Sequence, residues 1–374
     1  MALDTLIKVR HIFQSYPIFY QPYIPPVMDV LRVHPELDFG IQVFQGSADQ
    51  FVHKMPNYYY RRVFEKTYQI IKKPTYPLNY LEWLLLQQDV HIIHVQDSFL
   101  FKKVIGLLHM DASKRPKIVI TLRGNDTYVK PWIQNEWKDF YKNCGHQVDA
   151  FVVMSTHQKN YLHTNWGIAL DTIYVIPISF GNEQAVVPKS VDGSVLKIVS
   201  AFRMCWEKNI AGNLQVIRAL KARQVPVHYD IYGDGPDAGQ VPFLIEQYGL
   251  QDRVTYHGSV SNAVLKTHLH TAHIFLQLSH SDALPTSVLE AQALGLPAIV
   301  SNSGGLPESI IPNTSGYVVQ TSDVEQAADY ILELWGDAEK YAHFSEAAIR
   351  HAQTNFSVTN EVDRLLALYK TLID

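Results

Sequence analysis

The chain has 374 residues, too many for one ordinary hydrophobic core and suited to two domains of roughly 150–190 residues each. Its apolar content of 47% and charged content of 18% are those of a globular protein in water, and its net charge of −4 argues against general nucleic-acid binding, which requires a basic balance. Two cysteines without disulfide or metal-binding spacing, a polar N-terminus unlike a signal peptide and the lack of any run of about 18 apolar residues predict a cytoplasmic protein that meets a membrane only at its surface.

Six β-rich runs divide the first half of the chain. They predict strands at Leu6–Phe13, Phe39–Phe44, Val90–Val95, Lys117–Leu122, Ala150–Met154 and Ile173–Ile176. Several of these runs are continuously apolar instead of alternating, which is typical of parallel strands buried on both faces. The first half therefore predicts one parallel sheet.

The segment Lys54–Lys73, between the second and third of these strands, combines cations with aromatic residues. Its cations are Lys54, Arg61, Arg62, Lys66, Lys72 and Lys73, and its aromatic residues are Tyr58, Tyr59, Tyr60, Phe64 and Tyr68. This composition suits an anionic membrane surface or a lipid-linked ligand, and the aromatic rings also suit stacking on sugars. A surface helix whose aromatic side chains pack inward is the alternative.

The second half repeats the alternation of strands and helices. Strands are predicted at Leu196–Phe202, Pro226–Tyr232, Arg253–His257, His273–Leu278, Pro297–Ser301 and Gly316–Val319. Helices are predicted at Asn209–Ala222, Ser261–Thr271, Val324–Trp335, Ala338–Thr354 and Val358–Ile373. This order indicates an α/β protein with two doubly wound parallel sheets, six strands in each half. The polar stretch at 179–194 separates the halves, so we expect domains at 1–180 and 181–356 and a final helix within 357–374.

Polar or glycine-rich loops follow four strands of the second half. Because ligands of open parallel sheets bind at the carboxyl ends of the strands, these loops are expected to converge on one edge. Arginine can bind phosphate oxygens through two N–H groups, and a nearby lysine adds a second cation. In chain order the loops carry Arg203 with Lys208, Gly233 with Gly235, the segment Ser279 to Thr286, and Gly304 with Gly305.

The third of these loops runs into a helix start at Leu284-Pro285-Thr286-Ser287, flanked by the acids Asp282 and Glu290. Free N–H groups at a helix start bind anions, and the helix dipole favours negative charge there. Two acids would repel a bare phosphate, but they can accept hydrogen bonds from sugar hydroxyls. An anion site beside hydroxyl acceptors predicts a nucleotide sugar as the ligand.

Each feature taken alone also has a structural explanation. Glu290 could only complement the helix dipole, and Gly233-Asp234-Gly235-Pro236 could be only a tight turn. A single Arg or Lys after a strand is usually a solvated charge. Gly295 is interpreted as a helix C-cap, since Pro297 prevents the helix from continuing. The functional interpretation therefore depends on the joint order and spacing of the residues.

On these residues, the second half resembles the nucleotide-binding domain of glycosyltransferase family 4, which comprises retaining enzymes of the GT-B fold. The similarity spans about residues 195–320. It includes Arg203 with Lys208, Gly233-Asp234-Gly235-Pro236, Asp282 and Glu290 at their eight-residue spacing, Gly295-Leu296-Pro297, and Gly304-Gly305-Leu306-Pro307-Glu308.

The first half is less similar to the family's acceptor domain. The similar residues are His91-Ile92-Ile93-His94, Thr121-Leu122-Arg123-Gly124 and Val175-Ile176-Pro177. The opening Phe13–Tyr20 resembles the N-terminal loop of exopolysaccharide and lipopolysaccharide members, and Val358–Ile373 resembles the helix that crosses back to the first domain. The resemblance implies two Rossmann-like domains facing a central cleft, with the acceptor bound by the first and the donor by the second.

The resemblance also implies residue roles. Arg203 and Lys208 would neutralise the leaving diphosphate, Asp282 would contact the transferred sugar, and Glu290 would accept the ribose hydroxyls. The implied donor-binding set is Gly233, Gly235, Ala283, Leu284, Pro285, Thr286, Ser287, Gly304, Gly305 and Glu308. The implied acceptor-side set is Arg123, Gly124, Asn125 and Asp126, although loop capping explains the last two equally well.

The expected reaction is retaining transfer of a hexose from a UDP-, GDP- or ADP-sugar to a glycan or lipid-linked glycan in cell-surface polysaccharide or glycoconjugate synthesis. No metal or further cofactor is expected, because the chain has no Asp-x-Asp motif and cations with a helix start can stabilise the leaving group instead. The expected location is the cytoplasm, with peripheral contact at the inner face of the membrane left open.

Two departures from the family pattern leave alternatives open. Asp282 stands where the family usually has Glu, and Arg123 stands where many members have His. Because Arg cannot act as a base at neutral pH, Arg123 is assigned an electrostatic role. A catalytically silent GT-B protein that binds a nucleotide sugar is one alternative. A GT-B-like nucleotide-sugar epimerase is the other.

Overall fold

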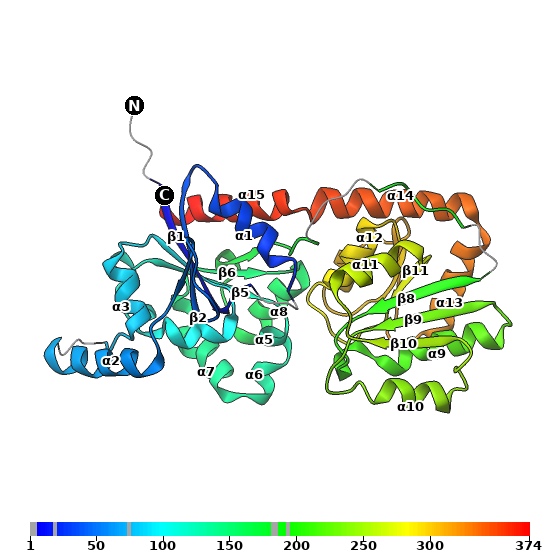
Figure 1. Cartoon of the computed structure of the whole chain (residues 1–374), viewed down its shortest axis with the longest axis horizontal. Helices are drawn as coiled ribbons and strands as arrows, with labels where there is room; N and C mark the ends of the chain where they lie inside the picture. Colours follow the sequence, from blue (N-terminus) through cyan, green and yellow to red (C-terminus); the bar gives the residue numbers. More distant parts are fainter. Residues whose placement is uncertain (1–5, 18–20, 73–75, 181–185, 192–194) are drawn as a thin grey trace. The chain divides into compact units, whose positions relative to one another are not determined.

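The computed structural model describes residues 6–17, 21–72, 76–180, 186–191 and 195–374 (Figure 1). The chain forms two compact units, one of Met1–Ile176 with Glu361–Asp374 and the other of Pro177–Asn360. The boundaries expected from the sequence fell at 180 and 356. Parts of the expected linker, 181–185 and 192–194, and residues 18–20 of the opening loop lie outside the described residues.

The first unit contains a seven-stranded parallel sheet in the order β3-β2-β1-β4-β5-β6-β7. Its strands are β1 (Ile7–Ser15), β2 (Leu37–Gln45), β3 (Val52–Lys54), β4 (Ile92–Val95), β5 (Lys117–Leu122), β6 (Ala150–Val153) and β7 (Ile173–Val175). The sequence predicted six strands in this half, which was wrong, because the sheet has a seventh strand, β3, at its edge. Three residues, of which only Val52 is buried, are too short a run to give a β pattern.

Helices cover both faces of this sheet. The helices are α1 (Ile24–Arg32), α2 (Tyr58–Lys72), α3 (Tyr80–Gln87), α4 (Ile105–Leu108), α5 (Asn125–Tyr128), α6 (Lys130–Ile133), α7 (Asn135–Cys144), α8 (Thr156–Trp166) and the C-terminal α15 (Val358–Ile373). Buried side chains of α3, α4, α7 and α8 form one core with the sheet, whereas α1 and α15 lie on the opposite face (Figure 1). Burial on both faces explains why the central strands are continuously apolar.

The second unit contains a six-stranded parallel sheet in the order β10-β9-β8-β11-β12-β13. Its strands are β8 (Leu196–Ala201), β9 (Val227–Tyr232), β10 (Val254–Gly258), β11 (Ile274–Gln277), β12 (Ala298–Ser301) and β13 (Gly316–Val319). All six strands predicted from the sequence are present. The strand order reverses direction at β8, next to β11, which is where open sheets of this kind bind ligands.

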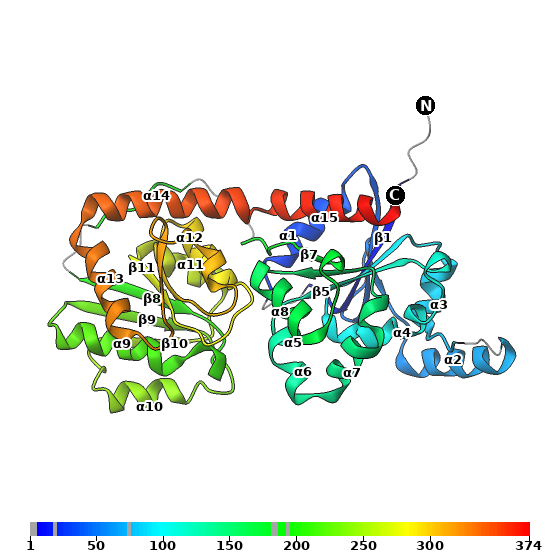
Figure 2. The ribbon, with the colours of Figure 1, turned by 180° about the vertical axis from the view of Figure 1, so that it is seen from behind.

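The helices of the second unit also form two layers (Figure 2). They are α9 (Ile210–Ala222), α10 (Gln240–Gln247), α11 (Asn262–Thr271), α12 (Thr286–Ala293), α13 (Val324–Gly336) and α14 (Ala338–Asn355). One core joins α9 and α13 to the sheet, and a second core joins α11 and α12 to its other face. Short 3-10 turns occur at Ser98–Lys103, Ala112–Lys114, Gly145–Gln147, Leu170–Thr172, Trp206–Lys208 and Leu306–Ser309.

A helix that spans a bilayer must be long and predominantly apolar. In the parts of the chain that the structure describes, no helix combines the length and the apolar character of a membrane-spanning helix.

Candidate functional site

The loops after β8 and β9 are joined through their backbones. Met204 N–H donates to the carbonyl of Asp234 at 3.0 Å. A Cβ atom at Gly233 would lie 1.9 Å from the carbonyl oxygen of Phe202, and one at Gly235 would lie 2.3 Å from that of Met204. Both glycines are therefore required for the close approach of the two loops. Their contacts explain the Gly-x-Gly spacing without a ligand, and donor binding by these glycines stays a prediction.

The loops after β11 and β12 meet in the same way. Gly305 N–H donates to the carbonyl of Asp282 at 2.8 Å. Gly304 has a φ of +59°, and a Cβ atom there would lie 2.0 Å from the same carbonyl oxygen. Glycine at position 304 thus fixes the backbone of Asp282, the residue whose carboxylate is predicted to contact the transferred sugar.

The side chains of Lys208 and Asp282 form an ion pair between the β8 and β11 loops. Both are mostly buried, with side-chain exposures of 17% and 11%. The same carboxylate oxygen of Asp282 accepts a hydrogen bond from Nε2 of Gln277 at 2.9 Å, and that nitrogen also donates to Oγ of Ser279 at 3.1 Å. Two residues that the sequence placed at the site are therefore brought into contact, and the buried amide of Gln277 holds them.

Asn213 of α9 forms hydrogen bonds with the loop after β8 and with the start of the loop after β11. Its Nδ2 donates to the carbonyl of Lys208 at 3.0 Å, and its Oδ1 accepts from the N–H of Leu278 at 3.0 Å. Its side chain is buried. Sequence reasoning missed both Asn213 and Gln277. The available signal was a polar residue in an otherwise apolar run, which is expensive to bury unless it is hydrogen-bonded.

Helix α12 begins at the predicted anion site without a side-chain cap. Its N-cap residue, Pro285, has extended backbone and makes no capping hydrogen bond. Within the described residues, the N–H groups of Thr286 and Ser287 donate to no acceptor. Two N–H groups are thus free at the start of the helix, where the helix dipole is positive.

Glu290 lies in the second turn of α12 and is 7% exposed. Its Oε1 accepts a hydrogen bond from Nδ2 of Asn262, the first residue of α11, at 2.8 Å. Burial raises the pKa of the Glu290 carboxyl, while Asn262 and the charge of Lys266 oppose that shift. The dipole of a helix acts mainly in its first turn, so complementing it does not account for this carboxylate.

Arg203 and Glu308 complete the predicted donor set on the β8 and β12 loops. Arg203 is exposed, and within the described residues its guanidinium makes no ion pair or hydrogen bond. Glu308 is half-buried in a 3-10 turn, where its N–H donates to the carbonyl of Gly305 at 3.0 Å. The exposed Arg203 therefore differs from Lys208, whose charge is already compensated by Asp282.

In the first unit, Asp126 stabilises the loop after β5. Its carboxylate accepts hydrogen bonds from the N–H groups of Arg123 and Gly124 at 3.1 and 3.0 Å and from Oγ of Ser98 at 2.6 Å. Asp126 is buried, whereas Asn125 is exposed at the start of α5. These contacts fit the loop-capping explanation for Asp126, and acceptor binding by Arg123, Gly124 and Asn125 stays a prediction.

Gln96 holds the side chain of Arg123. The guanidinium of Arg123 donates to Oε1 of Gln96 at 2.6 Å and to the carbonyl of the same residue. The Nε2 of Gln96 must then face His11, and it lies 3.1 Å from Nδ1 of that ring. Burial lowers the pKa of His11 to about 3, so the ring is neutral and its proton is on Nε2.

Tyr369 of α15 continues this chain of hydrogen bonds into the core. Its hydroxyl oxygen lies 2.9 Å from Nε2 of His11 and 2.7 Å from Nδ1 of His94. The Nε2 of His94 lies 2.7 Å from Oγ1 of Thr121. Since His11 donates to the hydroxyl, Tyr369 donates to His94, and His94 donates to Thr121. The final helix is thus joined to the sheet by a buried polar network that ends at Arg123.

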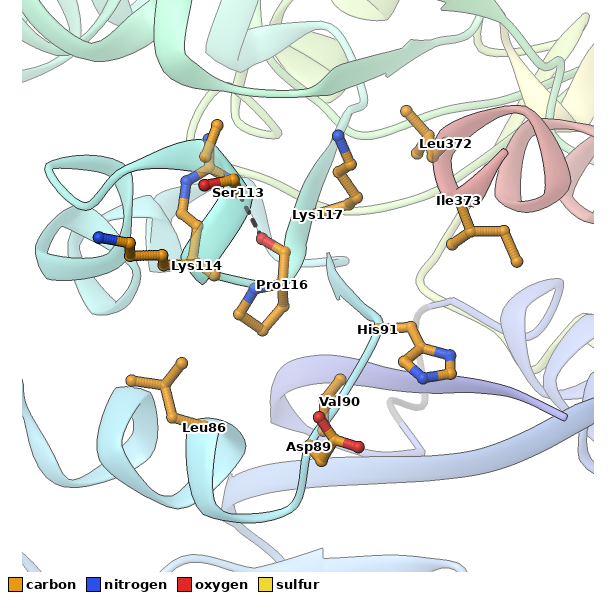
Figure 3. A pocket seen from close by; sticks show the side chains of 12 residues that line it. Leu86, Asp89, Val90, His91, Ser113, Lys114, Pro116, Lys117, Leu372 and Ile373 are labelled. Carbon is orange, nitrogen blue, oxygen red and sulfur yellow. Dashed lines mark hydrogen bonds between the residues drawn. The ribbon is translucent and has the colours of Figure 1, made fainter. Parts of the chain in front are cut away.

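A pocket of about 680 Å³ lies at the opposite, amino-terminal edge of this sheet (Figure 3). Its lining includes His91, Lys117 and Ile373, the last from α15. The buried guanidinium of Arg115 forms an ion pair with Asp149 at 2.5 Å, and Lys117 lies 3.6 Å from the same carboxylate. These two cations are compensated, and none of the predicted site residues lines this pocket.

Comparisons with known proteins find similar families for both halves of the chain. The model of "Glycosyltransferase Family 4" matches residues 35–178, and the model of "Glycosyl transferases group 1" matches residues 186–351. The N-acetyl-alpha-D-glucosaminyl L-malate synthase of Bacillus anthracis is 24% identical over 344 residues, which cover 85% of this chain and 84% of that protein.

Two further proteins that this chain resembles are also glycosyltransferases. The putative colanic acid biosynthesis glycosyltransferase WcaL of Salmonella typhimurium is 30% identical over 147 residues, which cover 38% of this chain and 36% of that protein. The crystal structure of a glycosyltransferase from Rickettsia africae aligns with a TM-score of 0.73 and 18% identity over 99% of both chains.

Proposed function

The chain belongs to glycosyltransferase family 4 and has its GT-B fold, and from this premise we propose that it transfers a hexose from a nucleoside-diphosphate sugar with retention of the anomeric configuration. The acceptor we propose is a glycan or lipid-linked glycan of a cell-surface polysaccharide or other glycoconjugate. The similarity to a colanic acid glycosyltransferase supports this setting. We place the reaction in the cytoplasm, at the inner face of the membrane where the acceptor is lipid-linked.

One observation supports the proposal most directly. Asp282, the partner of Lys208, lies three residues before Pro285, the N-cap of α12, so one side of the ion pair and the uncapped helix start belong to the same short loop of the second unit. A diphosphate would bind the free N–H groups and share the ammonium of Lys208, with Arg203 as a second cation. These groups provide positive charge for the leaving group without a metal ion, so we expect turnover to persist in a chelator.

The proposed step balances without a protein nucleophile. The acceptor hydroxyl attacks the anomeric carbon on the face from which the diphosphate leaves. As the bond between that carbon and the phosphate oxygen breaks, the hydroxyl proton passes to a diphosphate oxygen, giving the glycoside and the nucleoside diphosphate. Asp282 would hold the hexose and Glu290 the ribose hydroxyls while this occurs.

The first experiment is a thermal-shift panel with UDP, GDP and ADP. A nucleotide at about 100 times its dissociation constant adds roughly 2.7 kcal/mol to the free energy of unfolding, which gives a measurable shift. The corresponding donor sugars would then be incubated with the protein, and NMR would follow hydrolysis or transfer and the configuration of the product. We expect one nucleotide to bind and its sugar to be released or transferred with retained configuration.

The other outcomes separate the alternatives. Nucleotide binding with neither hydrolysis nor transfer identifies a catalytically silent protein. A changed configuration at another carbon of the free or nucleotide-linked sugar identifies an epimerase. Absence of binding to all three nucleotides contradicts the proposed donor site.

A further inference from the structure

Helix α2 is a 15-residue helix of which no side chain is buried. It projects from the body of the first unit (Figure 1). Its inward side is nevertheless fixed by aromatic contacts. The ring of Phe64 lies 4.7 Å from that of Trp83 and 5.1 Å from that of Tyr80, both on α3. The carboxylate of Glu65 also accepts a hydrogen bond from the N–H of Tyr80 at 3.1 Å.

The outward side of α2 is apolar. At about 100° of rotation per residue, Tyr59, Val63 and Ile70 fall on one face of the helix, about 120° away from the direction of Phe64. They are 71%, 47% and 72% exposed. Ile71, about 100° further round the helix and on the side of Phe64, is 69% exposed. The alternative in which the aromatic side chains of this segment pack inward therefore holds for Phe64 but not for the tyrosine at position 59.

Uncompensated positive charge borders one side of this apolar face, where Arg62 and Lys66 lie. The helix carries the four cations Arg61, Arg62, Lys66 and Lys72 and one acid, a net charge of +3, in a chain whose net charge is −4. Within the described residues, Arg62, Lys66 and Lys72 form no ion pair. The charge of this helix is thus opposite in sign to that of the whole protein.

We propose that α2 is a membrane-docking helix that lies in the interface of a bilayer containing anionic lipids. Tyr59, Val63 and Ile70 would insert among the upper acyl chains, and Arg62 and Lys66 would bind the lipid phosphates. Long cationic side chains can keep their charge at the headgroups while their stems lie on apolar surface. An exposed apolar stripe bordered by unpaired cations matches such an interface, because both burial of apolar area and charge attraction contribute to binding.

This inference deepens the proposed function, since a docked enzyme would meet a lipid-linked acceptor at the surface where it is embedded. The docking surface does not involve the donor site. Hydrolysis of a soluble nucleotide sugar reports on that site, and vesicle binding reports on α2. Each of the two proposals can therefore be contradicted without contradicting the other.

The experiment is vesicle flotation of the full chain. Vesicles of phosphatidylcholine alone are compared with vesicles in which part of it is replaced by phosphatidylglycerol, at low and high salt. We expect binding to the anionic vesicles and weaker binding at high salt, where the charges are screened. Equal binding to both vesicle types, or binding to neither, overturns the proposal.

Two pairs of variants test the surface itself. Arg62→Gln with Lys66→Gln should weaken partitioning by about 30-fold, at roughly fivefold for each cation removed. The matched control is Lys138→Gln with Lys142→Gln, because these two cations have the same spacing on the exposed side of α7. Ile70→Ser should reduce binding by at least about tenfold, whereas Phe243→Ser, at a 61% exposed position on α10, should not.

The α2 variants should keep the wild-type rate of donor hydrolysis and the wild-type unfolding temperature. Loss of vesicle binding in both control variants as well would show a general charge or hydrophobic effect and would overturn the assignment. Light scattering tests whether α2 instead binds a second copy of the chain. A dimer in the wild type that Ile70→Ser dissociates would show that α2 binds a second copy of the chain, and this result also overturns membrane docking.

Discussion

Lys208 and Asp282 are 74 residues apart in the chain, and their side chains form a mostly buried ion pair. The pair joins the loop after β8 to the loop after β11, at the point where the strand order of the sheet reverses. A buried charge without a partner is strongly unfavourable, so each residue fixes the position of the other. The pair therefore holds the backbone that leads into α12 in the arrangement that the proposed donor site needs.

Replacing Lys208 should abolish most activity while the protein stays folded. In Lys208→Ala, Gln277 still donates to Asp282, but the diphosphate loses a cation, and we expect turnover to fall by roughly 100-fold or more. The measurement is donor hydrolysis or transfer, with circular dichroism to verify the fold. Lys221→Ala, which removes an exposed lysine paired with Asp252, is the matched control. A rate near that of the wild type in Lys208→Ala would remove Lys208 from the site.

Replacing Glu290 should weaken donor binding more than it slows the chemical step. In Glu290→Gln the charged acceptor for the ribose hydroxyls is lost, and hydrogen bonds to charged groups contribute about 1.5–3 kcal/mol. The donor KM should therefore rise by roughly 10- to 100-fold. Steady-state kinetics measure KM and kcat separately, and a loss confined to kcat would contradict this role.

The raised pKa of Glu290 predicts that donor binding depends on pH. Burial raises the pKa of Glu290, so its carboxylate is protonated at a higher pH than an ordinary glutamate and then accepts poorly. The donor KM of the wild type should increase as the pH falls through this raised pKa. In Glu290→Gln that part of the pH profile should be absent, and an unchanged profile would show that another group titrates.

A methyl group at Gly304 should distort the site. The Cβ of Gly304→Ala would lie 2.0 Å from the carbonyl oxygen of Asp282, at a φ of +59° that favours glycine. We expect a loss of about 1–3 kcal/mol in the free energy of unfolding and a larger proportional loss of activity. Gly239→Ala is the control, because a Cβ there meets nothing within 4 Å. Equal behaviour of the two variants in urea unfolding and hydrolysis would argue against this explanation.

The hydroxyl of Tyr369 should contribute substantially to the stability of the first unit. Tyr369→Phe leaves ring nitrogens of His11 and His94 without their partner in the core, and each unsatisfied buried group costs about 1–3 kcal/mol. Urea unfolding should therefore show a loss of roughly 2 kcal/mol or more. Tyr59→Phe, at an exposed position, should change little. A loss below about 0.5 kcal/mol at position 369 would mean that the histidines find other partners.

Glu82 should make the stability of the first unit depend on pH. Its carboxylate accepts from the N–H groups of Asn79 and Leu107, yet burial raises its pKa to about 7. A carboxyl group whose pKa is raised by folding stabilises the fold below its unfolded pKa of 4.5, and this contribution is lost as the pH rises through 7.

The test compares the wild type with Glu82→Gln, which does not titrate. The free energy of unfolding of the wild type relative to the variant should decrease between pH 5 and pH 8. Because all other groups are shared, their contributions largely cancel in the difference. A difference that stays constant or increases over this range would contradict the assignment.

The sequence by itself determined the strand and helix alternation and the loops that carry the site. Continuous apolar runs such as Lys117–Leu122 reflect local burial, and a strand followed by a glycine or a charge shows where a loop begins. The helix Val358–Ile373 was predicted to the residue because its apolar spacing is regular. Such signals are contained in neighbouring residues. The three-residue β3 was missed because it is too short to carry one.

Only the tertiary structure decided which side chains meet. Asn213, Gln277 and Asn262 hold the predicted site residues. A polar residue in an apolar run marks Asn213 and Gln277 as unusual, but the local sequence does not show which groups they bind. The hydroxyl of Tyr369 reaches His94 across 275 residues of chain. These contacts follow from the strand order and the packing of helices on the sheets, so they exist only once the chain has folded, and residue spacing does not encode them.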